Sequence, residues 1–309
     1  MMKYRRLGNT GLKVSVVGFG SWQFGGEWGK AFTQSEADRL LGRAKELGVN
    51  LIDTAECYGD TASEGFIGNY IKDRRRDWVI ATKFGHKFHS AFNRTEHWKP
   101  EEVKQQLENS LRALRTDYID LYQFHSGSDS AFDNPDLWEE LGKQVASGKI
   151  RNLGISIGSN DNVHQTDSAG NVGATAIQVV YNRLDRKPEE RVFPSCLRQD
   201  LGVLARVPLA SGFLGGKYRP GAESEFGPDD VRGHWWKKED IVEAIRKVDE
   251  IRKTEVPVGV DMASWALAWC LKHPAVTCVI PGIKSVEQVE SNARAADLAS
   301  DDHPQTWSG

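Results

Sequence analysis

The chain of 309 residues is 39% hydrophobic and 27% charged, a composition typical of a folded globular protein and not of a disordered or collagen-like chain. Its 40 Lys and Arg residues against 43 Asp and Glu give a formal net charge of −3, which gives no reason to expect nucleic-acid or membrane binding. We therefore expect a small-molecule partner, and we favour a monomer.

The chain starts without the apolar stretch of a signal peptide, and no run of about 18 apolar residues occurs in it. Its four cysteines, Cys57, Cys196, Cys270 and Cys278, lack the spacing of a metal site or a redox motif. These features predict a soluble, cytoplasmic protein with free thiols and no bound metal.

Short apolar segments alternate with segments of helical periodicity along the chain. We expect eight strands, at residues 14–22, 49–55, 77–85, 117–126, 150–159, 174–182, 201–210 and 276–284. Helices are predicted where apolar residues recur three and four apart, at 35–48, 99–115, 134–148, 237–253, 261–273 and 285–299. Ser35, Pro100 and Ser285 mark predicted helix starts, and Gly48 and Gly148 follow predicted ends.

Strands that are apolar throughout are buried on both faces, as in parallel sheets covered by helices. Eight such units favour a closed (β/α)8 barrel, the TIM barrel fold of the α/β class, as a single domain over 1–309. The rival is an open doubly wound sheet, but the glycines of VVGFGSWQFGG lack the G-x-G-x-x-G spacing. We also expect an N-terminal β-hairpin and, after the seventh strand, a long loop at 217–238 that acts as a lid or arm.

The active site of such a barrel lies at the carboxyl ends of its strands. The polar residues that close the apolar segments are therefore candidates: Asp53, Lys83, His125, Ser156, Gln178, Asn182, Arg206 and Lys284. An Asp and a Lys on neighbouring strands, roughly 5 Å apart, are expected to pair, because an isolated buried charge is costly. Tyr58 follows Asp53 closely enough for a short loop to fold it over Lys83.

This grouping predicts acid catalysis of a carbonyl reduction. A cation beside a phenol stabilises the phenolate, so Lys83 is expected to lower the pKa of Tyr58. Tyr58 would donate a proton to the carbonyl oxygen, His125 would donate a hydrogen bond, and Asp53 would hold Lys83. Each residue alone also has an ordinary structural explanation, but their position on three consecutive strand ends favours catalysis. Cys57 is interpreted as a packing residue.

Three segments, LIDTAECYG, VIATKFG and DLYQFH, resemble signature segments of the aldo-keto reductase superfamily. The segments RNLGISI, IQVVYNRLDR, PLASGFLGGKY and IPGIKSVEQVESN extend the resemblance, especially to the bacterial branch related to the β subunits of voltage-gated potassium channels. The resemblance implies metal-free, NADPH-dependent reduction of aldehydes and some ketones to alcohols. It also implies that Asp53, Tyr58, Lys83 and His125 form the catalytic tetrad.

The resemblance further implies a cofactor site along the same rim. Ser156 and Gln178 would hold the nicotinamide carboxamide, with Ser21, Trp22 and Asp53 nearby. The loop after the seventh strand would cover the pyrophosphate through Pro208, Leu209, Ser211, Gly212, Leu214 and Lys217. The adenosine half would lie near Arg232, Gly282, Lys284, Gln288 and Asn292. Lys284 is the candidate for the 2′-phosphate, because an ammonium on a phosphate favours NADPH over NADH.

Three positions depart from the family pattern. Ile157 stands where many relatives have Asn or Arg, and Ser291 replaces a Glu often found near the adenine amine. Arg206 replaces the Tyr or Trp that stacks on the nicotinamide. Because its charge would lie beside the ring of NADP+, we expect a preference for NADPH over NADP+.

The substrate pocket is expected to be open, because few residues follow Asn292. It would be bounded by Trp22, Tyr58 and His125, with Trp28, His86 and the 84–98 loop around them.

Two alternatives remain open. One is a redox-sensing regulatory subunit that binds NADPH with little turnover; His125 argues against it, because the channel subunits lack a histidine there. The other is a Schiff-base aldolase acting through Lys83; Asp53 argues against it, because the carboxylate would keep the lysine charged. The sequence does not name the substrate.

Overall fold

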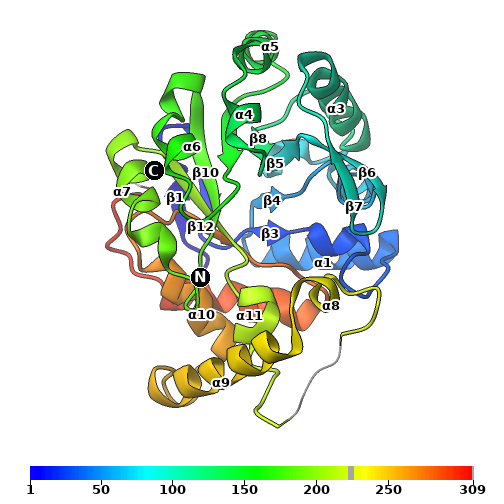
Figure 1. Cartoon of the computed structure of the whole chain (residues 1–309). Helices are drawn as coiled ribbons and strands as arrows, with labels where there is room; N and C mark the ends of the chain where they lie inside the picture. Colours follow the sequence, from blue (N-terminus) through cyan, green and yellow to red (C-terminus); the bar gives the residue numbers. More distant parts are fainter. Residues whose placement is uncertain (222–225, 308–309) are drawn as a thin grey trace.

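The computed structural model describes residues 1–221 and 226–307, and its centre is a sheet of eight parallel strands surrounded by helices (Figure 1). In chain order the strands are β3 (Phe19–Gly20), β4 (Leu51–Asp53), β5 (Val79–Phe84), β8 (Leu121–His125), β9 (Leu153–Ser156), β10 (Ala174–Val180), β11 (Gly202–Arg206) and β12 (Cys278–Ile280). Isolated parallel bridges, Val17 to Val279 and Gly20 to Gly282, join the first strand region to the last. The predicted (β/α)8 barrel is confirmed.

The amino end of the barrel is closed by the predicted N-terminal hairpin, formed by β1 (Tyr4–Arg6) and β2 (Lys13–Ser15). The first expected strand, 14–22, was therefore too long, because its start pairs antiparallel within this hairpin. Leu7 and Val14 belong to one buried cluster with inward residues of the barrel strands. The chain end pairs with the same hairpin, since the Arg6 amide donates to the Gln305 carbonyl at 2.8 Å.

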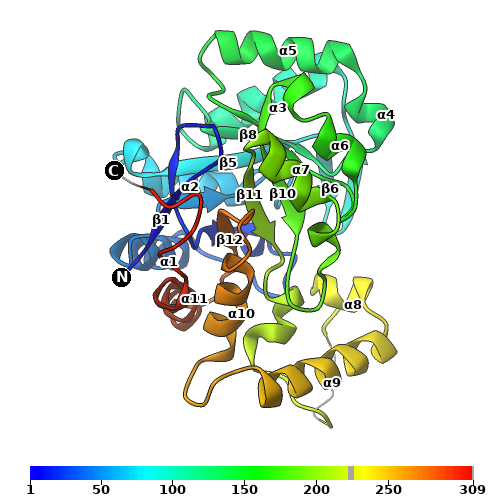
Figure 2. The same ribbon diagram turned by 90° about the vertical axis from the view of Figure 1, so that its left-hand side faces the viewer.

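Eleven helices lie within the described residues: α1 (Gln34–Glu46), α2 (Ala62–Ile71), α3 (Pro100–Ala113), α4 (Asp129–Phe132), α5 (Pro135–Ala146), α6 (Val163–Asp167), α7 (Val192–Gln199), α8 (Val231–Trp235), α9 (Lys238–Thr254), α10 (Met262–Leu271) and α11 (Val286–Leu298). Both views place α8 and α9 at the end of the molecule opposite α5 (Figures 1 and 2). None of these helices combines the length and the apolar character needed to cross a membrane.

The six predicted helices are present, and one predicted start was wrong. Helix α1 begins after Thr33 rather than at Ser35, because Thr33 and Glu36 form a capping box in which each side chain accepts from the other's backbone amide. Pro100 and Ser285 start α3 and α11 as expected. Helix α2 was missed because its sequence contains two glycines and has little periodicity.

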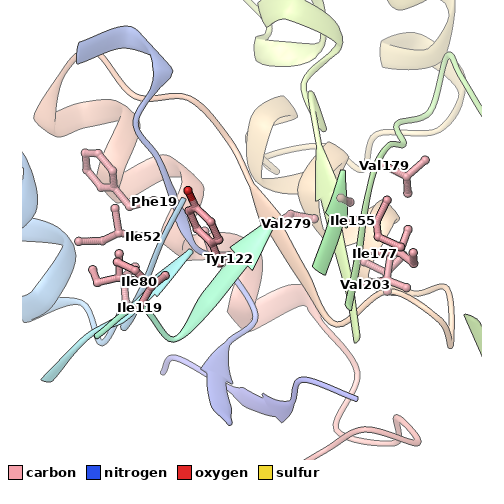
Figure 3. Close-up of a cluster of buried hydrophobic side chains, with 14 of the residues drawn as sticks. Phe19, Ile52, Ile80, Ile119, Tyr122, Ile155, Ile177, Val179, Val203 and Val279 are labelled. Atoms are coloured by element: carbon pink, nitrogen blue, oxygen red, sulfur yellow. The ribbon is translucent and has the colours of Figure 1, made fainter. Parts of the chain in front are cut away.

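Side chains along each strand point alternately to the outside and to the inside of the barrel, and only the inward ones reach the site. Side chains on the outer face, including Ile52, Ile80, Tyr122, Ile155 and Ile177, form one buried cluster between strands and helices (Figure 3). Burying a side chain of this size stabilises the fold by roughly 1.5–3 kcal/mol. The intervening inward residues fill the barrel: Leu51, Ala81, Leu121, Ala176 and Leu204. Since side chains alternate, the next inward positions reach the carboxyl rim together. They are Asp53, Lys83, Gln123, Gln178 and Arg206.

Two connections differ from the expected loops. The 84–98 segment contains an antiparallel hairpin of β6 (His86–Ser90) and β7 (Asn93–Glu96). After β11 comes the 3-10 helix η5 (Ala210–Gly215), and the expected 217–238 loop includes α8. Residues 222–225 of that loop lie outside the described residues.

Candidate active site

Lys83 is the centre of a buried polar cluster at the rim. Its ammonium donates hydrogen bonds to Asp53 Oδ1 at 2.6 Å, to the Thr54 carbonyl at 2.8 Å and to the Tyr58 hydroxyl at 3.2 Å. Lys83 is only 1% exposed, so these three acceptors replace water. The structure thus brings together Asp53, Tyr58 and Lys83, as the strand-end argument predicted.

The charges of Lys83 and Asp53 balance each other. Burial by itself lowers the pKa of Lys83, but Asp53 and Tyr58 offset it and leave the pKa raised. Lys83 is therefore a permanent cation near neutral pH.

The expectation for the Tyr58 pKa was wrong. Burial raises the pKa of Tyr58, and this effect outweighs the lowering by Lys83. The sequence argument considered the neighbouring cation but not the loss of water around a phenol that is only 7% exposed. Tyr58 is thus a protonated phenol at neutral pH, and Lys83 limits how far its pKa rises.

Two glutamines hold the second oxygen of Asp53. Gln178 Nε2 donates to Asp53 Oδ2 at 2.7 Å, and Gln123 Nε2 donates to the same oxygen at 3.2 Å. Sequence reasoning missed Gln123, although it lies two residues before His125 and therefore on the same inward face of β8. These bonds fix the carboxylate from the side opposite Lys83.

His125 lies against Tyr58, with ring centroids 5.9 Å apart and the rings nearly perpendicular. Burial holds the pKa of His125 well below its usual range, and the neighbouring cationic groups lower it further. The imidazole is therefore neutral. Its Nδ1 lies 3.7 Å from Cys57 Sγ, and burial raises the pKa of Cys57 to about 11, so the sulfur keeps its proton.

This contact is consistent with one tautomer of His125. If the protonated thiol donates to Nδ1, the imidazole proton lies on Nε2. Cys57 is thus a neighbour of the site histidine as well as a packing residue.

Aromatic residues form the wall beside Tyr58. Trp22 stacks on Tyr58 with ring centroids 5.8 Å apart, and Trp28 meets Trp22 edge-on at 5.1 Å. The indole of Trp22 donates to Glu27 Oε2 at 2.5 Å. His86 bonds through Nε2 to the His125 carbonyl at 2.6 Å. The pocket residues named from the sequence therefore gather, and Glu27 joins them without having been predicted.

Several buried polar atoms along the rim fit a bound nicotinamide cofactor. Ser156 Oγ, Arg206 Nε and Asn292 Nδ2 are buried and have no hydrogen-bond partner in the described part of the chain. Leaving such groups unpaired costs about 1–3 kcal/mol each, so their presence indicates a missing partner. These three residues belong to the nicotinamide and adenosine sets expected from the sequence.

The turn after β11 has the backbone of a binding loop. Val207, Ala210 and Ser211 have φ values of 53°, 47° and 56°, in the left-handed region. A β-branched residue such as Val207 is rarely found there, and such strain clusters at ligand sites. Ser21 lies across the rim, where its hydroxyl donates to the Asp53 carbonyl at 2.8 Å.

A group of cations lies where the adenosine half was expected. Burial lowers the pKa of Lys284, and Arg232, Lys217 and Lys30 lower it further, while Asp230 opposes them. Arg232 pairs with Asp230 at 2.7 Å and donates to the Tyr218 hydroxyl at 2.8 Å. Positive charge is therefore in excess around Lys284.

The remaining predicted residues have mainly local partners. Asn182 Oδ1 accepts from the amides of Leu184 and Asp185, so Asn182 stabilises a turn. Leu214 is fully buried in the cluster beneath η5. Gln288 accepts from the Lys284 amide at 2.7 Å, and Ser291 donates to Asp261 at 2.6 Å. At Gly282 an added Cβ would lie 2.0 Å from Gln23 Nε2, so a larger residue would require the Gln23 side chain to move.

Residues 16–306 match the sequence profile described as the aldo/keto reductase family. The chain belongs to this family. Among its relatives, the oxidoreductase YqkF of Bacillus subtilis is 31% identical over 300 residues, covering 96% of this chain and 92% of the relative. A probable voltage-gated potassium channel subunit beta from Oryza sativa is 29% identical, covering 96% of this chain and 92% of the relative.

Solved aldo-keto reductases share the fold. AKR11C1 from Bacillus halodurans, in its holo form, superposes with a TM-score of 0.80 at 30% identity, covering 97% of this chain and 92% of that one. The predicted family and its link to the channel β subunits are therefore confirmed, and this aldo/keto reductase is an oxidoreductase.

Proposed function

We propose that this aldo/keto reductase uses NADPH to reduce aldehydes, and some ketones, to alcohols, with Tyr58 as the general acid. The observation that carries the proposal is the buried contact between Tyr58 and Lys83, 3.2 Å from hydroxyl to ammonium. Asp53 and Thr54 hold Lys83 in place, so the cation is fixed before any substrate arrives.

The residues proposed to hold NADPH lie along the rim from β9 to α11. Ser156 and Gln178 would take the nicotinamide carboxamide, while Arg206 would lie on the nicotinamide ring. The strained turn at 207–211, with Pro208, Leu209, Gly212 and Lys217, would cover the pyrophosphate. Lys284 and Arg232 would face the 2′-phosphate, which supports NADPH over NADH because NADH lacks that charge.

The chemistry divides between the cofactor and the chain. When bound, NADPH supplies a hydride to the carbonyl carbon. Tyr58 donates its phenolic proton to the carbonyl oxygen as negative charge develops there. Lys83 stabilises the phenolate that remains, and Asp53 keeps Lys83 in position. His125 is neutral, and in its Nε2–H tautomer it donates a hydrogen bond to the same oxygen.

The test is NADPH consumption with a panel of aldehydes and ketones, in the wild type and in Tyr58→Phe. The variant keeps the aromatic packing on Trp22 but lacks the proton, so kcat is expected to fall about 10²–10⁴-fold. Tyr118→Phe, a half-buried tyrosine between α3 and β8 that contacts Arg75 and Arg151, is the matched control and should keep wild-type activity. Undiminished turnover in Tyr58→Phe would remove the proposed acid.

The same assay separates the proposed reductase from two alternatives, because neither of them is expected to consume NADPH with an aldehyde. A Schiff-base aldolase is disfavoured because Asp53 and Tyr58 keep Lys83 charged, and a charged amine is not a nucleophile. A regulatory subunit is favoured only by the similarity to a channel β subunit. It predicts tight NADPH binding with no turnover of any carbonyl compound.

A further inference from the structure

We propose that Arg94 binds a carboxylate of the substrate, so that the preferred substrates are aldehydes carrying a carboxylate a few carbons from the carbonyl. This inference rests on the proposed carbonyl reduction and names its substrate class. Arg94 lies on β7, in the hairpin that replaces the loop expected at 84–98.

The position of Arg94 puts it beside Tyr58, the proposed acid. Its guanidinium carbon is 5.8 Å from the Tyr58 ring and 5.9 Å from the Trp22 ring. Phe88 of the same hairpin packs against the cluster that contains Tyr58 and Cys57. The Arg94 side chain is 21% exposed, so part of it is open to a substrate that approaches Tyr58.

Arg94 is held by one carboxylate and keeps donors to spare. Its Nη2 pairs with Glu27, which is 1% exposed and also accepts from the Trp22 indole and from the Phe92 amide at 3.3 Å. Arg94 Nε is buried without a hydrogen-bond partner among residues 1–221 and 226–307. A guanidinium has five N–H groups in a planar fork that matches a carboxylate, so Glu27 orients Arg94 without using its full capacity.

The charges around the pocket favour a monoanion. Asp53 balances Lys83, and Glu27 balances Arg94. Arg206 is a third cation, partly exposed at the end of β11, and no carboxylate among the described residues lies within ion-pair distance of it. Glu56 lies in the loop between β4 and α2, but its carboxylate accepts a hydrogen bond from Asn109 of α3 rather than pairing with Arg206. The three cations and two carboxylates therefore carry one excess positive charge, which favours a substrate carboxylate at Arg94 over an uncharged group.

The experiment compares 4-oxobutanoate with its methyl ester, which has the same carbonyl and nearly the same shape but no charge. A charge-assisted hydrogen bond is worth about 1.5–3 kcal/mol, so kcat/KM of the wild type should favour the acid by about 10–100-fold. Arg94→Gln should abolish this preference. Glu27→Gln, which frees Arg94 from its partner, should increase it. Lys87→Gln, an exposed cation on the same hairpin, is the control and should leave the ratio unchanged.

Arg94→Gln leaves Glu27 buried without its cation and could therefore misfold. A second variant serves as the control for this effect. The double variant Glu27→Gln with Arg94→Gln removes both charges and should fold, reduce the ester and show no preference for the acid. The inference is overturned if the wild type takes both compounds equally, if Arg94→Gln keeps the preference, or if both variants lose the two activities in parallel. A wild type that reduces neither compound, nor any aldehyde of the panel, would instead refute the proposed function.

Discussion

Lys83 Nζ lies between two buried partners, Asp53 Oδ1 at 2.6 Å and the Tyr58 hydroxyl at 3.2 Å. Removing either charge of the Asp53–Lys83 pair leaves the other buried and uncompensated. We expect Asp53→Asn and Lys83→Met each to lower the free energy of unfolding by about 3–5 kcal/mol.

The double variant should lose much less than the sum of the two, because no charge is then left unpaired. Urea unfolding of the four proteins measures the coupling directly. Additive losses would mean that the two groups do not depend on each other. All three variants should also lose turnover, since Tyr58 no longer faces a fixed cation.

Cys57 is expected to set the proton position on His125. In Cys57→Ala the Nδ1 atom loses its donor, so the imidazole proton is free to move from Nε2 to Nδ1. With a hydrogen bond worth about 0.5–1 kcal/mol, kcat should fall about two- to five-fold. Nitrogen chemical shifts of His125 report the tautomer, and an unchanged Nε2–H form in the variant would contradict this role. Cys196→Ala, a buried thiol far along the chain, serves as the control.

Glu64 makes stability depend on pH. Burial raises the pKa of Glu64 to about 7 from 4.5, and its Oε1 accepts from Thr82 at 2.6 Å. Between these values the folded protein holds a proton that the unfolded chain releases, so stability falls as pH rises from 4.5 to 7. The loss attributable to Glu64 is roughly 3 kcal/mol.

Glu64→Gln cannot ionise, so its urea midpoint should fall less than that of the wild type between pH 5 and pH 8. Glu108→Gln, which removes a partly exposed carboxylate paired with Lys149, should keep the wild-type pH dependence. If the urea midpoints of the wild type and of Glu64→Gln changed equally with pH, Glu64 would ionise with the pKa of an ordinary carboxyl group.

Arg206 is expected to weaken the binding of NADP+ more than the binding of NADPH, because the oxidised nicotinamide ring carries a positive charge. If the repulsion is about 1.4 kcal/mol, Kd for NADP+ exceeds Kd for NADPH about ten-fold. In Arg206→Tyr the two values should converge. Titration of tryptophan fluorescence measures both constants, and an unchanged ratio in the variant would rule out this explanation.

Lys284 is expected to separate NADPH from NADH. Lys284→Gln removes one charge opposite the proposed 2′-phosphate, so Kd for NADPH should rise about ten-fold or more while Kd for NADH changes little. Lys272→Gln, at the end of α10, is the control for a general change of charge. If Lys284→Gln raised Kd for NADPH and Kd for NADH equally, Lys284 would not be the residue that binds the 2′-phosphate.

The barrel and the set of strand-end residues could be predicted from the sequence. The set consists of Asp53, Lys83, His125, Ser156, Gln178 and Arg206. Both follow from local rules, because alternation along a strand and the parallel order of βα units put the last inward residue of each strand on one rim. The same rule covers Gln123.

Which groups from distant segments meet at the rim could not be predicted from the sequence, because it depends on the complete fold. Arg94 and Glu27 are 67 positions apart, and nothing in the local pattern of either segment predicts their contact. The direction of the Tyr58 pKa was decided in the same way, because burial depends on every element packed around the phenol, whereas Lys83 is a single neighbour. Periodicity encodes where a side chain points; the water and charge around it depend on the whole fold.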